Sequence, residues 1–409
     1  MAQLRTLLMI AVTTVLVTSC SNAAVDKVTS ATLDPINQPS QAIPDEALLD
    51  VGIPTLDPGL DLTDEKDTVL PEVRYAESVF MADRIAKTLQ KSNAWGAVRV
   101  IPNNDIVVDL YVRGVIEQSD GETLKLAITV VDTSGAVWYK KDYKQMVGKY
   151  TYDRRIRHQN DPFQNLYTEI ANDLLAFREK MSHDDAVALR TLSELRFAKA
   201  FSPEAFGEHV SENRKGILKI ERLPAENDTI LARVNRIRDK DYLYIDTMQD
   251  YYERFSGRMQ GPYQDWRKGS YDYVQKVRQM DERARAKIFA GVIAIAAGIY
   301  GRNTANDGYQ YDAATIGAGA GGVLIKSGLD DRNKAAGYRE SLSEMGASLS
   351  AELEPQVIEL DDSTITLTGT VNNQYEQWRE LLDKIYRAER GDTATTAESA
   401  DLSTKDGGE

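Results

Sequence analysis

Cys20 is the single cysteine of this 409-residue chain, which raises the question of what its thiol does. One cysteine excludes an intramolecular disulfide and a metal site built from several thiolates. The residues before it have the pattern of an export signal, because Arg5 precedes an apolar run over residues 7–17. As a helix this run rises about 16 Å, which is too short for a bilayer core of about 30 Å. We expect residues 1–19 to be a signal peptide.

Val17, Thr18 and Ser19, followed by Cys20, resemble the lipobox of bacterial lipoproteins. The resemblance implies cleavage before Cys20, a thioether-linked diacylglycerol on its sulfur, and an acyl chain such as palmitate on its amine. Several buried acyl chains make a stable membrane anchor where one would be marginal. Ser21 resembles the residue found in lipoproteins sorted to the outer membrane, which implies a periplasm-facing protein. An ordinary signal peptide followed by a chance cysteine is the alternative.

Other side chains that could do chemistry are sparse. The candidate general bases are His158, His183 and His209, each in a charged, loop-like or helix-end context where a solvated surface histidine is expected. The adjacent acid pairs are Asp184-Asp185, Asp330-Asp331 and Asp361-Asp362. Neighbours in sequence point apart, and no metal-loop, serine-elbow, zinc-protease or nucleotide-loop motif occurs. The sequence therefore predicts no catalytic residue, no metal site and no cofactor besides the lipid on Cys20.

The formal net charge of −14 argues against nucleic acid or an anionic membrane surface as the main partner, because both favour basic patches. Much of the acidity lies near the ends of the chain. Residues 21–71 contain ten acids against two lysines, half of the twelve prolines and no aromatic residue. Such a composition buries too little apolar surface to offset the entropy of ordering. We expect residues 20–71 to form the lipid anchor and a disordered acidic tether, and residues 390–409 a disordered acidic tail.

Residues 72–182 have the pattern of a small α/β module. Helical periodicity over residues 76–89 is followed by a short strand at 98–101 and three longer strands at 106–117, 123–132 and 136–143. Gly121 and Gly135 are expected at positive φ in the two hairpin turns. A helix over residues 161–181 completes the unit. This succession resembles the N-terminal module of TolB-type periplasmic lipoproteins, which implies a compact domain that docks partners.

Residues 183–337 are expected to be helical. Apolar residues between positions 228 and 255 recur at spacings of four and three, with Asp241 as the one polar member, which is typical of a coiled-coil seam. Pro262 begins a second run with similar spacing. Because the linker between the two runs is short, the sequence predicts an antiparallel hairpin of long helices.

Two apolar segments rich in glycine and alanine, residues 288–301 and 313–328, enclose a polar loop. Small residues recur at helical spacing, at Ala290, Ala294 and Gly298 in the first segment and at Gly317 and Gly321 in the second. Glycine costs ~1 kcal/mol per helix position relative to alanine, so close helix approach is the expected reason for its presence. Residues 288–328 resemble the glycine-zipper hairpins of envelope lipoproteins. Two interpretations stay open: the packed end of a soluble hairpin, or a tip that contacts a membrane or other copies of the chain.

Residues 338–389 have the pattern of a small α-β-β-α unit. The segment TITLTGTV, residues 364–371, with the helical stretch that follows it resembles the hairpin and helix of BON domains. That resemblance implies a module associated with membrane or peptidoglycan attachment. Chance alternation of apolar residues is the alternative.

Taken together, these patterns predict an α+β protein that is not an enzyme. We expect an outer-membrane-anchored periplasmic lipoprotein that acts as a scaffold or accessory in an envelope assembly, transport or secretion complex. Its expected partners are outer-membrane lipid and envelope proteins, with a homo-oligomer left open and nucleic acid excluded. The alternative is a membrane-inserting or self-assembling oligomer built on the glycine-zipper hairpin. An envelope hydrolase is less favoured, because no nucleophile motif is present.

Overall fold

The computed structural model describes residues 33–62, 71–152, 161–304 and 371–390. These residues combine helices with a mixed sheet, which confirms the α+β class. The strands are β1 (Val51–Pro54), β2 (Val98–Ile101), β3 (Leu110–Ser119), β4 (Thr123–Asp132), β5 (Val137–Met146), β6 (Val210–Glu212) and β7 (Leu218–Ile220). The α-helices are α2 (Pro71–Gln90), α3 (Gln164–Arg178), α4 (His183–Phe201), α5 (Pro203–Phe206), α6 (Thr229–Thr304) and α8 (Val371–Arg390). Three short 3-10 helices are η1 (Asp45–Ala47), η2 (Leu60–Leu62) and η3 (Lys149–Tyr152).

The main sheet has the strand order β2-β1-β3-β4-β5. β1 pairs in parallel with both β2 and β3, whereas β3, β4 and β5 form an antiparallel meander. The chain passes from β1 through α2 to β2, since parallel neighbours require a crossover connection. The predicted helix, short strand and three-strand meander are thereby confirmed in order, and β4 has the predicted bounds.

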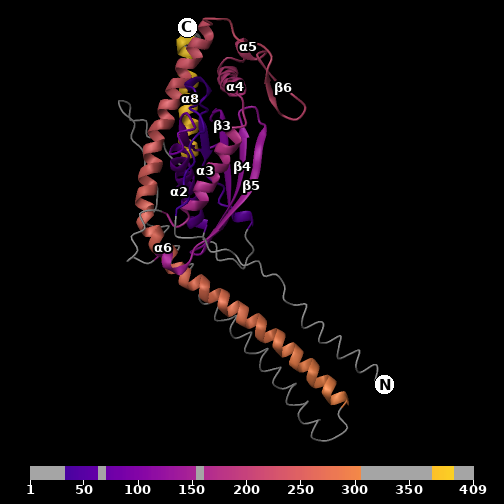
Figure 1. Ribbon diagram of the computed structural model, residues 1–409. Coiled ribbons are helices and arrows are strands. Elements are labelled where there is room, and N and C mark those ends of the chain that lie inside the picture. Colours follow the sequence, from indigo (N-terminus) through magenta and orange to yellow (C-terminus); the bar gives the residue numbers. More distant parts are fainter. Residues whose placement is uncertain (1–32, 63–70, 153–160, 305–370, 391–409) are drawn as a thin grey trace, which may run out of the picture.

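The core lies between the sheet and the helices α2 and α3 (Figure 1). Alternate residues of β4, from Leu124 to Val130, are buried, while the residues between them are half-buried. On α2 the buried stripe includes Phe80, Ile85 and Leu89, each at most 1% exposed. Buried side chains repeat with a period of two on the strand and of about 3.6 on the helix, so each element has one apolar face. These two faces pack against each other.

The expected disordered tether over residues 20–71 is wrong for residues 33–62. β1 lies inside the sheet, with Val51 and Ile53 at 0% exposure. Asp50, one of the acids that indicated disorder, has partners far away in sequence: its carboxylate accepts from Ala97 N at 2.8 Å, and its amide N donates to the Asp109 carboxylate at 2.8 Å. Tertiary hydrogen bonds and burial on both sides thus compensate for the low apolar content of this segment.

The two hairpin glycines have different roles. Gly135 has φ +91, as predicted for its turn. Gly121 does not adopt positive φ, so that prediction is wrong. Instead α6 passes so close that a Cβ on Gly121 would lie 2.3 Å from the carbonyl oxygen of Arg267 and 2.6 Å from the amide nitrogen of Tyr271. Gly121 is therefore required for the close approach of α6 to the β3–β4 turn.

The expectation of continuous helix after residue 183 is wrong between α5 and α6. A small hairpin of β6 and β7 lies there, with Val210 opposite Ile220. Gly216 has φ +77 in its turn, a conformation that favours glycine. Short strands of three residues give little sequence signal, because the period of two cannot repeat often enough to be recognised.

The predicted antiparallel hairpin around residue 260 is also wrong, because α6 is one continuous helix through Gly257, Gly261 and Pro262. Proline inside a helix costs about 3 kcal/mol. Phe255, Met259 and Tyr263, which surround these residues, are all buried in the main core, and their burial offsets the poor helix propensity. The predicted apolar seam is buried from Val234 to Phe255, but its partners are the sheet module and α8 rather than a second long helix.

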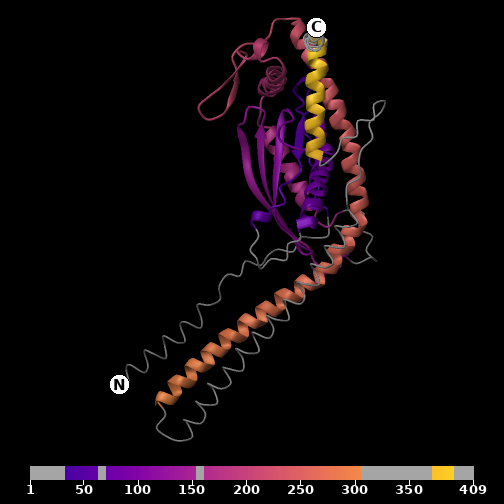
Figure 2. The same cartoon turned by 180° about the vertical axis from the view of Figure 1, so that it is seen from behind.

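α8 confirms the last predicted helix and lies beside the first half of α6 (Figure 2). It belongs to the same packed body rather than to a separate unit, because Leu382 and Tyr386 share a core cluster with Phe201 of α4. The other predicted elements of the C-terminal unit, residues 338–370, lie outside the described residues. So do the second glycine-rich segment, residues 313–328, and the acidic tail. Among the helices that the structure describes, none has the length and apolar character needed to cross a membrane.

Candidate functional site

The most distinctive described feature is the end of α6, which projects from the other described elements (Figures 1 and 2). We call residues 276–304 the arm, and the strands, the other helices and residues 229–275 of α6 the body. Gln275 donates a hydrogen bond to Glu122 beside the β3–β4 turn, and the arm continues beyond it. At 1.5 Å per residue the arm is about 45 Å long. Ala290, Ala294 and Gly298 lie on it.

The first half of α6 covers the open edge of strand β2. Gln249 uses its side-chain amide as a neighbouring strand would: it accepts from Val100 N at 2.8 Å and donates to Val100 O at 2.8 Å. Arg99 on the same strand donates to Asp246 at 2.6 Å. An exposed strand edge invites pairing with other chains, so these bonds close the edge and align α6 with the sheet.

The arm root, defined as Arg267, Asp161, Tyr263 and Glu77, holds α6 where the arm begins. Arg267 and Asp161 form an ion pair at 3.0 Å with side-chain exposures of 0% and 1%. The Asp161 carboxylate also accepts from Phe163 N at 2.9 Å, at the start of α3. A desolvated pair is weak evidence for net stability, but removing one partner leaves an uncompensated buried charge. The pair therefore joins α6 to the start of α3 in one geometry.

Aromatic rings surround the Arg267 guanidinium. Its carbon lies 3.9 Å from the ring centroid of Tyr263 and 4.9 Å from that of Phe163. Burial opposes the charged form, yet the Asp161 carboxylate and nearby tyrosines hold the pKa of Arg267 well above its usual value. Tyr263 in turn donates to the Glu77 carboxylate of α2, which also accepts from Ser119 Oγ at 2.6 Å. The root thus links α6 to α2 and to the start of α3 through buried polar groups, and the half-buried Ser119 extends the link to β3.

A second buried polar contact lies between α6 and α8. Asp241, 1% exposed, accepts from Tyr375 Oη at 3.3 Å and from Trp378 Nε1 at 3.2 Å. Arg379 Nη1 lies 3.8 Å from the same carboxylate. Burial raises the pKa of Asp241 to about 6, against the lowering effect of Arg379 and of the two hydrogen bonds. Asp241 is the polar member of the predicted seam, and it is placed to receive α8.

This raised pKa predicts a pH dependence of stability. Between the ordinary value of 3.8 and about 6, folded protein keeps a proton on Asp241 that the unfolded chain has released. The free energy of unfolding should therefore fall as the pH rises through this range. Asp241→Asn keeps an acceptor for Tyr375 and Trp378 but has no proton to release. It should therefore remove this pH-dependent fall in the free energy of unfolding, which is on the order of 1–3 kcal/mol. Urea unfolding of the wild type and of Asp241→Asn at several pH values measures this difference. Parallel pH profiles of the two proteins would contradict the assignment of the pH dependence to Asp241.

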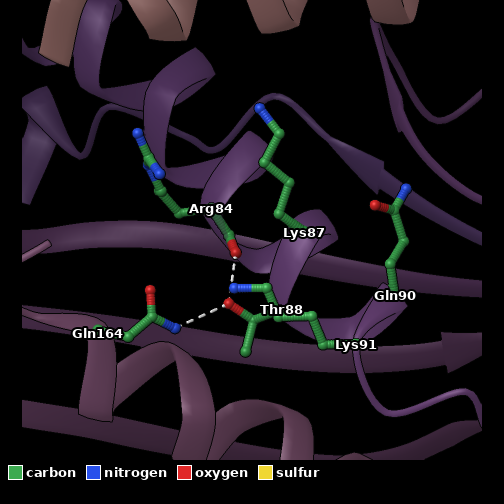
Figure 3. A pocket seen from close by; sticks show the side chains of 6 residues that line it. All are labelled: Arg84, Lys87, Thr88, Gln90, Lys91 and Gln164. Atoms are coloured by element: carbon green, nitrogen blue, oxygen red, sulfur yellow. Dashed lines mark hydrogen bonds between the residues drawn. The ribbon is translucent and has the colours of Figure 1, made fainter. Parts of the chain in front are cut away.

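A cavity of about 310 Å³ lies between α2 and α3. Its lining residues, drawn in Figure 3, are Arg84, Lys87, Thr88, Gln90, Lys91 and Gln164. Gln164 Nε2 donates to Thr88 Oγ1 at 3.0 Å and so joins the two helices at the cavity. Lys87 is bonded to Asp83 at 3.0 Å. Three of the six lining side chains are cationic and none is acidic, so the basic pocket is suited to an anion. Its residues gave no motif, because their grouping depends on how two helices meet.

The site residues predicted from sequence are only partly placed. Cys20 and the lipobox residues Val17, Thr18 and Ser19 lie outside the described residues, as do Gly317, Gly321 and His158. His183 is exposed at the start of α4, as expected. His209 was expected to be solvated, but it is 6% exposed, with its Nδ1 2.8 Å from the carbonyl oxygen of Arg222 and its ring beside Phe206. His209 is buried because the β6–β7 hairpin, which the sequence did not predict, covers it.

No family model, curated protein or solved structure matches this chain. Within the described ranges, no group of three or more histidine, cysteine, aspartate or glutamate side chains could hold a metal ion. The described residues present two candidate sites, the α6 arm with its buried polar root and the basic pocket on the body.

Proposed function

We propose that this protein is an outer-membrane lipoprotein of the periplasm that acts as a scaffold or accessory in an envelope assembly, transport or secretion complex. In this proposal the α6 arm is the contact element. The observation that carries it is the continuity of α6: one 76-residue helix is buried along the body and extends beyond it. A long helix that continues past its buried part is suited to contact a partner.

The arm root supports a mechanical role for the body. Arg267 and Asp161 hold α6 against α3, and Tyr263 and Glu77 hold it against α2. Gly121 lets the helix backbone touch the β3–β4 turn. Three contacts on different elements fix the direction in which the arm leaves the body. A fixed direction lowers the entropy lost when a partner binds, which is the advantage of a preorganised scaffold.

The lipid anchor is the other part of the proposal. Twelve residues lie between Cys20 and Leu33, where the described chain begins. Fully extended, they reach at most about 45 Å. Residues 34–40 are bonded to α3 through Asn165, Asn172 and Glu179. In the lipidated protein the body would thus stay within that distance of the membrane, rather than at the end of a fifty-residue tether.

The second candidate function is self-assembly or membrane contact through a glycine-zipper hairpin. It is favoured by the position of the apolar residues 288–301, which fall in the distal half of the arm. Ala290, Ala294 and Gly298 recur there at helical spacing. Small residues allow two helices to approach closely, both in water and in lipid.

Changing Cys20 to alanine tests the anchor and separates the two candidates. If Cys20 is lipidated, Cys20→Ala, exported with the signal peptide of a soluble protein, should move from the membrane fraction to the soluble periplasmic fraction. Mass spectrometry of the wild-type amino terminus should show the diacylglycerol and acyl chain only when Cys20 is present. A wild-type terminus without lipid would refute the anchor. A soluble monomer would eliminate membrane insertion and self-assembly, whereas membrane retention that Gly298→Leu abolishes would favour them.

Site-specific crosslinking tests the scaffold role. A photoreactive amino acid at Gln279, exposed near the start of the arm, should give a defined crosslinked species in intact cells. The same residue at Lys219, exposed on β7, is the matched control on the body. Crosslinks from Lys219 but not from Gln279 would contradict the arm as the contact element. A product at twice the chain mass would indicate self-assembly instead.

A further inference from the structure

The basic pocket between α2 and α3 has more positive charge than its surroundings neutralise. Arg84 and Lys87 lie three residues apart on α2 and so share one face of the helix, and Lys91 follows directly after the helix ends at Gln90. Figure 3 shows the side chains of Arg84 and Lys87 projecting to the same side of α2. Lys87 is paired with Asp83, but among the described residues neither Arg84 nor Lys91 forms an ion pair with a carboxylate. Two cations therefore remain available to a ligand.

Arg84 is held in place by an aromatic contact rather than by an ion pair with a described carboxylate. Its guanidinium lies over the ring of Phe80 at 4.7 Å, and its Nε is buried without a hydrogen-bond partner. Gln164 is fixed by its bond to Thr88. A buried donor without a partner costs free energy that a bound anion would recover. Arginine beside lysine, with donors already oriented, is the combination that binds phosphate oxygens.

The amino-terminal segment crosses the rim of this pocket. Asp34 N donates to Asn165, the neighbour of Gln164, at 3.0 Å. Four residues later, Gln38 Nε2 donates to the carbonyl oxygen of Lys91 at 2.8 Å. The described part of the chain therefore begins beside the basic pocket. Thirteen residues lie between Cys20 and Asp34, so a membrane that held Cys20 would lie within about 50 Å of the pocket.

We propose that the basic pocket binds the phosphate of an anionic phospholipid headgroup. The choice of a headgroup over free phosphate rests on the proposed lipid anchor, whereas the phosphate chemistry rests on the pocket alone. Arg84 and Lys91 would contact phosphate oxygens, and Lys87 would add its charge while keeping its bond to Asp83. Binding would orient the α2–α3 side of the body toward the bilayer and so set the direction of the arm. A protein with a net charge of −14 needs such a local basic site to approach an anionic surface.

The test uses the full mature chain with Cys20→Ala, so that vesicle binding does not depend on lipidation. Affinity is measured for vesicles of phosphatidylglycerol mixed with phosphatidylcholine, for phosphatidylcholine alone, and for inorganic phosphate. The pocket variant carries Arg84→Gln, Lys87→Gln and Lys91→Gln. The matched control carries Arg214→Gln, Lys215→Gln and Lys219→Gln on the β6–β7 hairpin, which is the same change of net charge. A double variant, Lys87→Gln with Lys91→Gln, leaves the stacking of Arg84 on Phe80 intact if the triple variant folds poorly.

We expect the pocket variant to lose at least about tenfold in affinity for phosphatidylglycerol vesicles, and the control less than about twofold, since each basic residue near an anionic surface contributes ~1 kcal/mol. Equal losses in both variants would overturn the proposal, because they would indicate non-specific attraction. Binding of inorganic phosphate without vesicle binding would overturn the headgroup and assign the pocket to free phosphate. No binding of either ligand would overturn the site. None of these outcomes bears on lipidation, which is read from the mass of the wild-type amino terminus.

Discussion

Replacing Arg267 by methionine is expected to lower the free energy of unfolding by about 3–5 kcal/mol. Methionine fills much of the same space, so the loss is electrostatic: the Asp161 carboxylate, 1% exposed, would remain buried without its cation. Asp161 cannot move to solvent easily, because it also accepts from Phe163 N at the start of α3. Urea unfolding of the full chain with Cys20→Ala measures the change.

Two further variants make this prediction specific. Lys268→Met replaces the neighbouring exposed cation and should change the free energy of unfolding by less than about 0.5 kcal/mol. Arg267→Met combined with Asp161→Asn removes both charges and should recover most of the lost stability, because no unpaired charge is left. A cost below about 1 kcal/mol for Arg267→Met, or equal costs for residues 267 and 268, would mean that the root does not hold the arm.

Replacing Leu49 by alanine is expected to cost about 2–5 kcal/mol. Leu49 is 0% exposed and belongs to the main core beside β1, so its removal would leave a cavity between packed elements. The same substitution in a disordered tether would cost nothing. The measurement therefore tests whether this segment is disordered, as its composition indicates, or folded into the sheet.

Leu62→Ala is the matched control, since it removes the same atoms from the same segment at a residue that is 61% exposed. Its cost should stay below about 0.5 kcal/mol. Thermal or urea unfolding of the two variants side by side provides the comparison. Equal stability of Leu49→Ala and wild type would show that residues 33–62 contribute nothing to the folded core.

Local signals predicted the elements of the α/β module well. The helical stripe that includes Phe80 and Leu89 and the alternation along β4 each depend on residues close together in sequence. β1 could not be predicted in this way. It has four residues, one of them proline, and its burial depends on pairing with β2 and β3, whose residues come some fifty positions later. Non-local pairing of a short strand gives no periodic signal.

The path of α6 shows the same limit for helices. Spacing identified the buried face from Val234 to Phe255, yet Gly257 and Pro262 indicated a turn that does not exist. The decisive contacts of Tyr263 and Arg267 lie on α2 and before α3, far away in the sequence. Helix propensity is a local free energy of a few kcal/mol, and tertiary burial of several large side chains outweighs it.

For the candidate sites, the amino-acid pattern alone specifies chemistry that is contiguous in the chain. The apolar run before Cys20 and the small residues Ala290, Ala294 and Gly298 are of this kind, and their roles stay predictions. The basic pocket and the arm root arise differently, because Gln164 meets Arg84, and Asp161 meets Arg267, only after the helices have packed. Periodicity tells which face of a helix is apolar. It does not tell which surface that face will meet, because the free energy of packing is shared between residues that only the folded chain brings together.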